Sequence, residues 1–321
     1  MMTHEPQPNT HHHSGPGRED QVGLSRVLVA TDFSPESACA LTRALQLPLR
    51  QGAEILLVHA LPPAAAAGRP DEEEALARHA LEVAEQHART KRARAAFRVR
   101  SLLVKGLPSE TLSQAARNFG AELIVMGRPR RPGSLLARIR ERMTGGLIES
   151  IPTALLIVGP PPICEYRRPL VAVDFTQASR HAMEAVFRMC PGASRVAVLH
   201  DYDTSYEFVL HQSAAPLARI LEYQREARAR ALAELHRFLE PYRDSGVDFD
   251  ELVLSGDAPA SIVELAHAEN ADLVIVGRHM RAGLGRLVRP HVAQQVTRES
   301  TCDVLILEQE PPEAPPSEVN P

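Results

Sequence analysis

The chain contains no tryptophan, and aromatic residues make up only 4% of its 321 residues, so its cores must be built from aliphatic side chains. No stretch approaches the roughly 18 consecutive apolar residues that a membrane-spanning helix needs. The polar N-terminus also lacks the apolar core of a signal peptide. We therefore expect a cytoplasmic protein without a membrane partner.

Strong net charge and closely spaced cysteines are also missing. The formal net charge is −4 and the isoelectric point is about 6.4, so no global field would attract nucleic acid. Cys39, Cys164, Cys190 and Cys302 are far apart in the sequence, which excludes a zinc ribbon and does not fit a disulfide framework. The motifs G-x-S-x-G, G-x-x-x-x-G-K-[ST] and H-E-x-x-H do not occur. We therefore expect no enzyme.

What the chain does contain is an internal repeat. Segments of the first half return in the same order in the second half, about 141 to 150 positions later. The matching pairs are 26–34 with 169–176, 55–59 with 196–200, 121–128 with 271–278, and 154–158 with 304–307. This pattern indicates a tandem duplication.

Each half alternates short apolar runs with stretches of helical spacing, which predicts five buried strands and four helices. Ser34 and Pro35 form a plausible start for a helix on which Ala38, Leu41, Ala44, Leu45 and Leu49 share one face. The other helices are expected near 72–92, 107–119 (ended by Gly120) and 141–150, and near 177–190, 214–242, 259–269 and 291–300.

Strands joined by crossover helices are parallel and covered on both faces. The predicted fold class is therefore α/β, with two tandem, doubly wound, mostly parallel five-stranded sheets. We expect domains at 25–159 and 169–308, joined by a stiff polar linker at 160–168. The N-terminal arm 1–24 and the tail 309–321 are predicted to be disordered.

Several motifs resemble those of the universal stress protein family. In the first half they are the strand end at 30–37, the sequence Val-Lys-Gly at 104–106 and the apolar segment 121–127. The second half carries their counterparts at 173–179, 254–256 and 271–278. The resemblance implies a Rossmann-like, adenine-nucleotide α-hydrolase-like fold and dimers that pair through the final strand. We therefore expect an intramolecular pseudo-dimer through residues 153–158 and 302–307; a further homodimer stays open.

ATP-binding members of that family carry Gly-x-x-Gly, nine residues, and then Gly-Ser or Gly-Thr. Counted from Gly127, the second and third glycine positions hold Arg130 and Arg140; counted from Gly277, they hold Met280 and Pro290. A side chain at these positions would fill the place that a phosphate approaches. We therefore expect no tight ATP binding and no firm cofactor, and binding of ATP or AMP remains an alternative.

The candidate ligand cleft lies at the carboxyl ends of the strands, where open α/β sheets bind ligands. Asp32 and Asp174 follow the first strand of each half, and the resemblance implies that the aspartate lies close to a nucleotide. The alternative is that each aspartate caps the following helix. The candidate positions are Asp32, Val58, Gly127, Arg130, Gly133, Arg140, Asp174, Leu199, Gly277 and Gly283.

Arginine and histidine offer two further hypotheses. The arginines at 128, 130, 131, 138, 140 and 142, with 278, 281, 286 and 289, form either a pocket for a small anionic ligand or a solvated surface. His59 and His200 are interpreted as packing residues. We predict no metal site, although His200–Asp203 and the run His11–His13 offer metal-ligand types.

The sequence therefore favours a non-catalytic, cytoplasmic stress-response protein that binds a small ligand, an unidentified partner protein, or both. One alternative is a regulatory switch that binds ATP or AMP and hydrolyses it weakly in one domain. Another is a carrier or sensor of an anionic or lipid-like metabolite.

Overall fold

The computed structural model describes residues 23–62, 70–91, 97–128, 153–159, 164–202, 210, 212–213, 216–278 and 292–307. The predicted helix at 141–150, the tail 309–321 and all but the last two residues of the predicted arm 1–24 lie outside these ranges. Those last two residues are structured, because strand β1 begins at Leu24, whose side chain is buried. The predicted arm is therefore too long at its C-terminal end.

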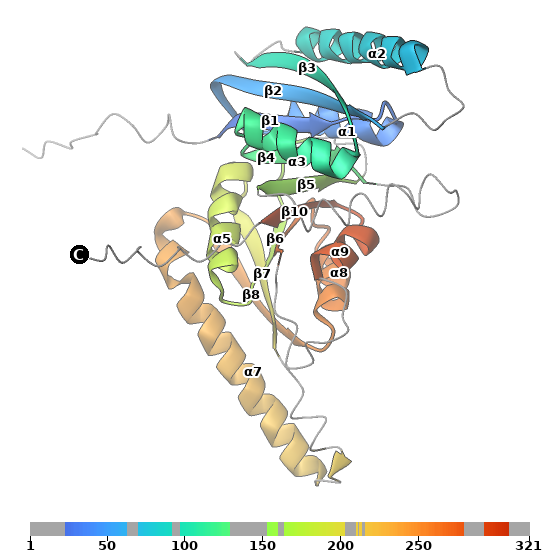
Figure 1. The fold of residues 1–321 in the computed structure, drawn as a ribbon. Coiled ribbons are helices and arrows are strands. Elements are labelled where there is room, and N and C mark those ends of the chain that lie inside the picture. The colour runs from blue at the N-terminus through green and yellow to red at the C-terminus, as the bar shows by residue number, and fades with distance from the viewer. Residues whose placement is uncertain are drawn as a thin grey trace, which may run out of the picture.

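The two halves share one ten-stranded sheet with the order β3-β2-β1-β4-β5-β10-β9-β6-β7-β8 (Figure 1). The first five strands pair in parallel with one another, and so do the last five, which confirms the predicted α/β fold class. Their bounds are β1 Leu24–Ala30, β2 Leu49–Leu61, β3 Arg98–Lys105, β4 Leu123–Gly127, β5 Ala154–Val158, β6 Pro169–Ala172, β7 Arg195–Tyr202, β8 Asp248–Ser255, β9 Leu273–Gly277 and β10 Asp303–Leu307.

The halves join where β5 and β10 run antiparallel at the centre of the sheet. Leu155 lies opposite Ile306, Leu156 opposite Leu305, and Ile157 opposite Val304. All six side chains are buried. The expected pairing of the final strands is confirmed, and it merges the two predicted sheets into one.

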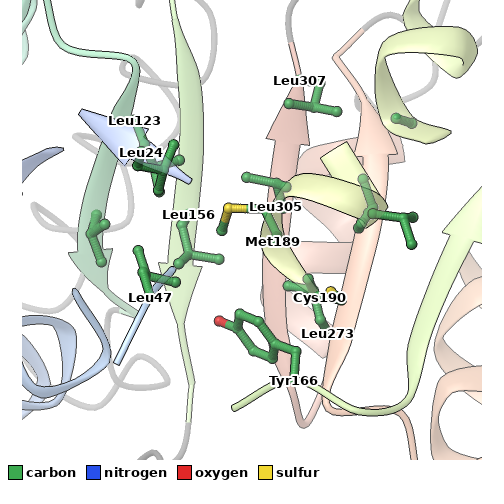
Figure 2. Close-up of a cluster of buried hydrophobic side chains, with 14 of the residues drawn as sticks. Leu24, Leu47, Leu123, Leu156, Tyr166, Met189, Cys190, Leu273, Leu305 and Leu307 are labelled. Carbon is green, nitrogen blue, oxygen red and sulfur yellow. The ribbon is translucent and has the colours of Figure 1, made fainter. Parts of the chain in front are cut away.

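Each face of the sheet carries one set of helices, contributed by both halves. One buried cluster joins helices α1 Pro35–Ala44, α2 Pro70–Thr90, α5 Gln177–Met189 and α7 Leu217–Leu239 to the sheet. A second cluster lies against α3 Pro108–Phe119, α8 Ala258–Ala268 and α9 Val292–Glu299. Figure 2 shows the first cluster crossing the junction, where Leu156 of β5 faces Leu305 of β10 and Met189 of α5. A 3-10 helix, η2, spans Glu240–Ser245.

The first helix begins as predicted but ends earlier. The Ser34 side chain accepts a hydrogen bond from the Ser37 N–H, and Pro35 occupies the first turn. The helix stops at Ala44, and Leu49 is instead the first residue of β2. The reason is Pro48, which disfavours helical backbone at the residue before it and has no N–H to donate. Ala38, expected on the apolar face, is exposed.

The predicted polar linker contributes to the core. Tyr166 is only 2% exposed and packs in the cluster that crosses the junction (Figure 2). The prediction was wrong at this residue because a phenol can be buried when its hydroxyl finds a partner, as described below. Residues 160–163 lie outside the described part of the chain.

Candidate functional site

In both halves the first strand leads into the following helix through a turn held by an aspartate. The Asp32 Oδ1 atom accepts hydrogen bonds from the Ser34 N–H (3.0 Å) and hydroxyl (2.5 Å). The Asp174 Oδ1 atom accepts them from the Thr176 N–H (3.1 Å), the Thr176 hydroxyl (2.5 Å) and the Ser179 hydroxyl (2.8 Å). These bonds support the reading in which each aspartate stabilises the turn and the helix start.

The phenylalanine after each aspartate has left-handed backbone geometry. The φ angle is 61° at Phe33 and 63° at Phe175, a conformation that costs a residue other than glycine roughly 1–2 kcal/mol. Such strain clusters at functional sites and persists only where the surroundings enforce it. Its recurrence in both halves therefore marks this turn as the candidate site.

A histidine lies against each of these rings. The centroids of Phe33 and His59 are 4.4 Å apart, and those of Phe175 and His200 are 4.2 Å apart. The Nδ1 atom of His59 lies 2.8 Å from the Thr31 carbonyl oxygen, and that of His200 lies 2.9 Å from the Val173 carbonyl oxygen. A carbonyl only accepts hydrogen bonds, so Nδ1 carries the proton. Both histidines pack and hydrogen-bond as predicted.

The phenylalanines were missed by the sequence analysis. The signal was nevertheless available, since Asp-Phe followed by a hydroxyl residue occurs at 32–34 and again at 174–176. What the sequence does not carry is the sign of φ, because a bulky aromatic residue ordinarily avoids the left-handed region.

Val58 and Leu199 take part in the candidate site through their backbones. Their side chains are buried, at 0% and 1% exposure. The Val58 carbonyl accepts a hydrogen bond from the Thr31 N–H (2.9 Å), and the Leu199 carbonyl accepts one from the Val173 N–H (2.8 Å). Both residues thus fix the strand ends beneath the turn, with their side chains in the core.

The glycine that ends β4 has a packing role. A Cβ atom added to Gly127 would lie 2.4 Å from the backbone carbon and oxygen of Glu36, at the start of α1. The glycine is therefore required by the close approach of α1 to the sheet, independently of any ligand. Its counterpart Gly277 is buried in β9, in register with Leu307.

Of the arginine-rich segment 128–142, the structure describes only its first residue. The Arg128 guanidinium donates hydrogen bonds to the carbonyls of Ser300 and Cys302 in the other half, and burial lowers its pKa. Arg128 therefore joins the two halves. Its counterpart Arg278 is only 5% exposed. Arg130, Gly133, Arg140 and Gly283, with the remaining arginines of both segments, lie outside the described residues.

A buried polar network stabilises the junction. The Asp303 Oδ2 atom accepts hydrogen bonds from Arg43 Nε (2.8 Å) and the Tyr166 hydroxyl (2.6 Å), while Oδ1 accepts one from the Gly159 N–H (2.8 Å). The Arg43 guanidinium also donates to the Cys164 carbonyl (2.7 Å) and lies over the Tyr166 ring. Burial, above all, raises the pKa of Tyr166 well above its ordinary value. Neither Arg43 nor Asp303 was singled out from the sequence.

The described residues of the alternative metal group at 200–203 do not converge on one point. His200 and Asp201 are consecutive in β7, so their side chains point to opposite faces of the sheet. Asp201 accepts a hydrogen bond from the Ser261 hydroxyl (2.7 Å) instead. Across the residues that the structure describes, no group of three or more His, Cys, Asp or Glu is placed to hold a metal ion. Asp203 and His11–His13 lie outside those residues.

The duplicated sheet and the repeated Asp-Phe turn define a tandem, doubly wound α/β protein. The model of the "Universal stress protein family" matches residues 23–159 and again 165–308. The chain therefore belongs to the universal stress protein family and carries two of its domains in tandem.

Curated relatives match one domain's length of this chain. Universal stress protein YxiE of Bacillus subtilis is 25% identical over 149 residues, which are 44% of this chain and 99% of that protein. The putative universal stress protein SAUSA300_1656 of Staphylococcus aureus is 28% identical over 149 residues, 45% of this chain and 86% of that protein.

Solved structures share the whole arrangement. A universal stress protein from Archaeoglobus fulgidus superposes with a TM-score of 0.65 at 17% identity, covering 88% of this chain and 96% of that one. The functionally unknown protein PA1789 from Pseudomonas aeruginosa has a TM-score of 0.52 at 18% identity, covering 89% and 92%. At these identities the likeness shows the fold. Within the described residues, none of the helices combines the length and apolar character needed to span a membrane.

Proposed function

We propose that this protein is a non-catalytic, cytoplasmic regulator of the stress response that acts by binding a small ligand or a partner protein at its two Asp-Phe turns. Family membership supports the stress-response role in general. The observation that carries the proposal is the strained phenylalanine at the same place in both halves, with its ring packed against a histidine. The left-handed backbone is unfavourable in both turns. We infer that it is retained because it holds a preorganised surface at the carboxyl ends of the strands, where sheets of this class bind ligands.

Catalysis is not part of the proposal, because the polar groups of the turn are bonded to one another. The carboxylates of Asp32 and Asp174 accept from neighbouring hydroxyl and N–H groups, and His59 and His200 use Nδ1 on backbone carbonyls. The hydroxyls of Ser34, Thr176 and Ser179 donate to these carboxylates and not to a histidine base. The turn is thus organised to hold its shape.

The aromatic rings favour one alternative in particular. An aromatic ring beside a histidine at the carboxyl ends of the strands can pack against a planar group, which keeps the AMP- or ATP-binding switch as the second candidate. Gly127 does not favour it, since its glycine requirement is explained by Glu36.

Mass spectrometry of protein purified from its own cells, under native conditions and after denaturation, tests the ligand. A thermal-shift series with ATP and AMP complements it, since ligand at 100 times its Kd stabilises a fold by about 2.7 kcal/mol. We expect no such shift with ATP. Stoichiometric release of ATP or AMP would instead establish the nucleotide switch, and release of another anionic or lipid-like molecule would establish the carrier.

The regulatory role itself is tested in a deletion strain. We expect reduced survival under stress, restored by the wild-type chain and not by the double variant Phe33→Ala/Phe175→Ala at equal protein level. Restoration by that double variant would show that the turns are not the functional site.

A further inference from the structure

The two outermost strands of the sheet carry opposite charge. Strand β3 at one end has Arg98, Arg100 and Lys105 and no acidic residue. Strand β8 at the other end has Asp248, Asp250 and Glu251 and no basic residue. Each is the third strand of its half, and the two lie at the opposite ends of the sheet. The sheet therefore has a basic strand at one end and an acidic strand at the other.

Four of these charges lie on the same face of the sheet. Arg100 is in register with Leu56, and Asp250 with Ala197, and both apolar residues belong to the cluster on the α3 and α8 side. Since side chains alternate along a strand, Arg98 and Asp248 share that face. If β3 of one chain pairs with β8 of another so that these faces coincide, arginines therefore meet aspartates.

Internal ion pairs use only part of this charge. Arg100 is paired with Glu54, and Arg195 with Asp250; both arginine side chains are exposed, and both carboxylates are partly buried. Arg98 and the Asp248 carboxylate form no hydrogen bond or ion pair within the described part of the chain. Each end therefore keeps one charged group available to a partner, and the exposed arginines of the internal pairs can rearrange at small cost.

Exposed apolar side chains gather at the same two ends. Nine large hydrophobic residues are exposed in the described chain, and all except Phe33 lie on the outermost elements or the loop after β3. At the β3 end they are Leu76, Val83, Leu102 and Leu107; at the β8 end they are Leu217, Leu221, Leu232 and Leu254. Leu102 and Leu107 also line a cavity of about 590 Å³ between β3 and α3.

The directions of the strands are compatible with pairing between copies. Strands β3 and β8 run in opposite directions, because the halves meet antiparallel at β5 and β10. Helices α2 and α7 lie on the same side of the sheet at its opposite ends (Figure 1). A second copy placed end to end would thus continue the sheet with an antiparallel β3–β8 pair, and α7 of one copy would adjoin α2 of the next.

We propose that a second copy of this chain binds at the end of the sheet, with β3 of one chain beside β8 of the next. The two surfaces differ, so the contact is heterologous and each pair of chains keeps one free end of each kind. Arginine–aspartate contacts select the pairing, and the exposed leucines of α2, α7, β3 and β8 supply the apolar contact. Rows of such chains would form open-ended oligomers.

Two charge-reversal variants test this, with sedimentation velocity across protein concentrations at low and high salt. We expect wild-type oligomers whose association weakens as salt rises. Arg98→Glu/Arg100→Glu gives a chain with two acidic ends, and Asp248→Arg/Asp250→Arg gives one with two basic ends. Each variant alone should self-associate at least tenfold more weakly than wild type, and a mixture of the two should regain association.

The mixture separates complementarity from misfolding, because two damaged chains would not restore each other. Arg168→Glu/Arg298→Glu, which reverses two charges outside β3 and β8, should associate like wild type. The proposal is overturned if the wild-type chain stays monomeric up to about 1 mM. It is also overturned if the end variants associate as wild type does, or if their mixture gains nothing.

Discussion

The two halves of this protein share the same turn but contribute different residues to the junction between them. Both retain the Asp-Phe turn, the strained φ angle and the histidine packed against the phenylalanine ring. At the junction, by contrast, the buried aspartate of the second half, Asp303, stands where the first half has Ala154, and Arg43 of the first half stands where the second has Ala185. Duplication followed by divergence has thus preserved the candidate site and specialised the contact between the copies.

The largest effect is expected from breaking that specialised junction. Asp303→Ala leaves the buried Arg43 guanidinium without its carboxylate, and removing one partner of a buried pair costs about 3–5 kcal/mol. The equivalent place in the other half is Ala154, and Thr153→Ala, one residue before it, removes only a hydroxyl that donates to the Ala121 and Glu122 carbonyls and should cost about 1 kcal/mol. Urea unfolding of both variants measures the difference.

A third variant identifies the cause. Asp303→Asn keeps acceptor capacity for part of the network but removes the charge, so its free energy of unfolding should fall between those of Asp303→Ala and wild type. Equal losses for Asp303→Ala and Thr153→Ala would show that the buried Arg43–Asp303 pair contributes no more than one hydroxyl hydrogen bond at the start of β5.

A smaller effect should distinguish the two turns. Phe175 is half-buried, and its ring also lies 5.5 Å from that of Phe238, whereas Phe33 is 39% exposed. We expect Phe175→Ala to lower the free energy of unfolding by about 2–3 kcal/mol. Phe33→Ala should cost about 1 kcal/mol or less, because the exposed ring buries less apolar surface; alanine keeps the strained left-handed backbone at both positions.

The same denaturation assay measures both phenylalanine variants. Each phenylalanine variant is the control for the other, since the two turns have the same geometry. An equal cost at both positions would mean that the surrounding core, and not the turn, decides the energetics.

The smallest expected effect is on the pH dependence of the free energy of unfolding, and it comes from Asp201 in the second half. Burial, above all, raises the pKa of Asp201, against a hydrogen bond from Ser261 that lowers it. The unfolded chain therefore releases this proton first as pH rises above about 3.9. The native state then binds more protons than the unfolded state, so stability falls with rising pH through this window.

Asp201→Asn should remove that fall, since the amide keeps an oxygen acceptor for Ser261 and has no proton to lose. Thermal unfolding from about pH 4 to about pH 7 measures it. Exposed Asp244→Asn should leave the pH dependence as in wild type. If stability fell with rising pH as steeply in Asp201→Asn as in wild type, the pH dependence would belong to another group.

The helices and strands were predicted well from the sequence because the repeat presents the pattern of each element twice. Strand runs, the Ser34 cap and the Gly120 end of α3 all follow from local chemistry. Leu49 and Tyr166 were misassigned because a proline turn and a distant carboxylate decide their places. The site was predicted at Asp32 and Asp174 but not at Phe33 and Phe175, since strain is imposed by packing that sequence periodicity does not express.

The antiparallel contact of β5 with β10 has a consequence for biosynthesis. Strand β5 ends at Val158, yet its partner begins at Asp303, close to the end of the chain. At the usual 5–20 residues per second, roughly 7–30 s separate the synthesis of these two strands. Throughout that interval the edge of β5 that later pairs with β10 has no strand beside it, so we expect the first half to complete its side of the junction only after the second half has been synthesised.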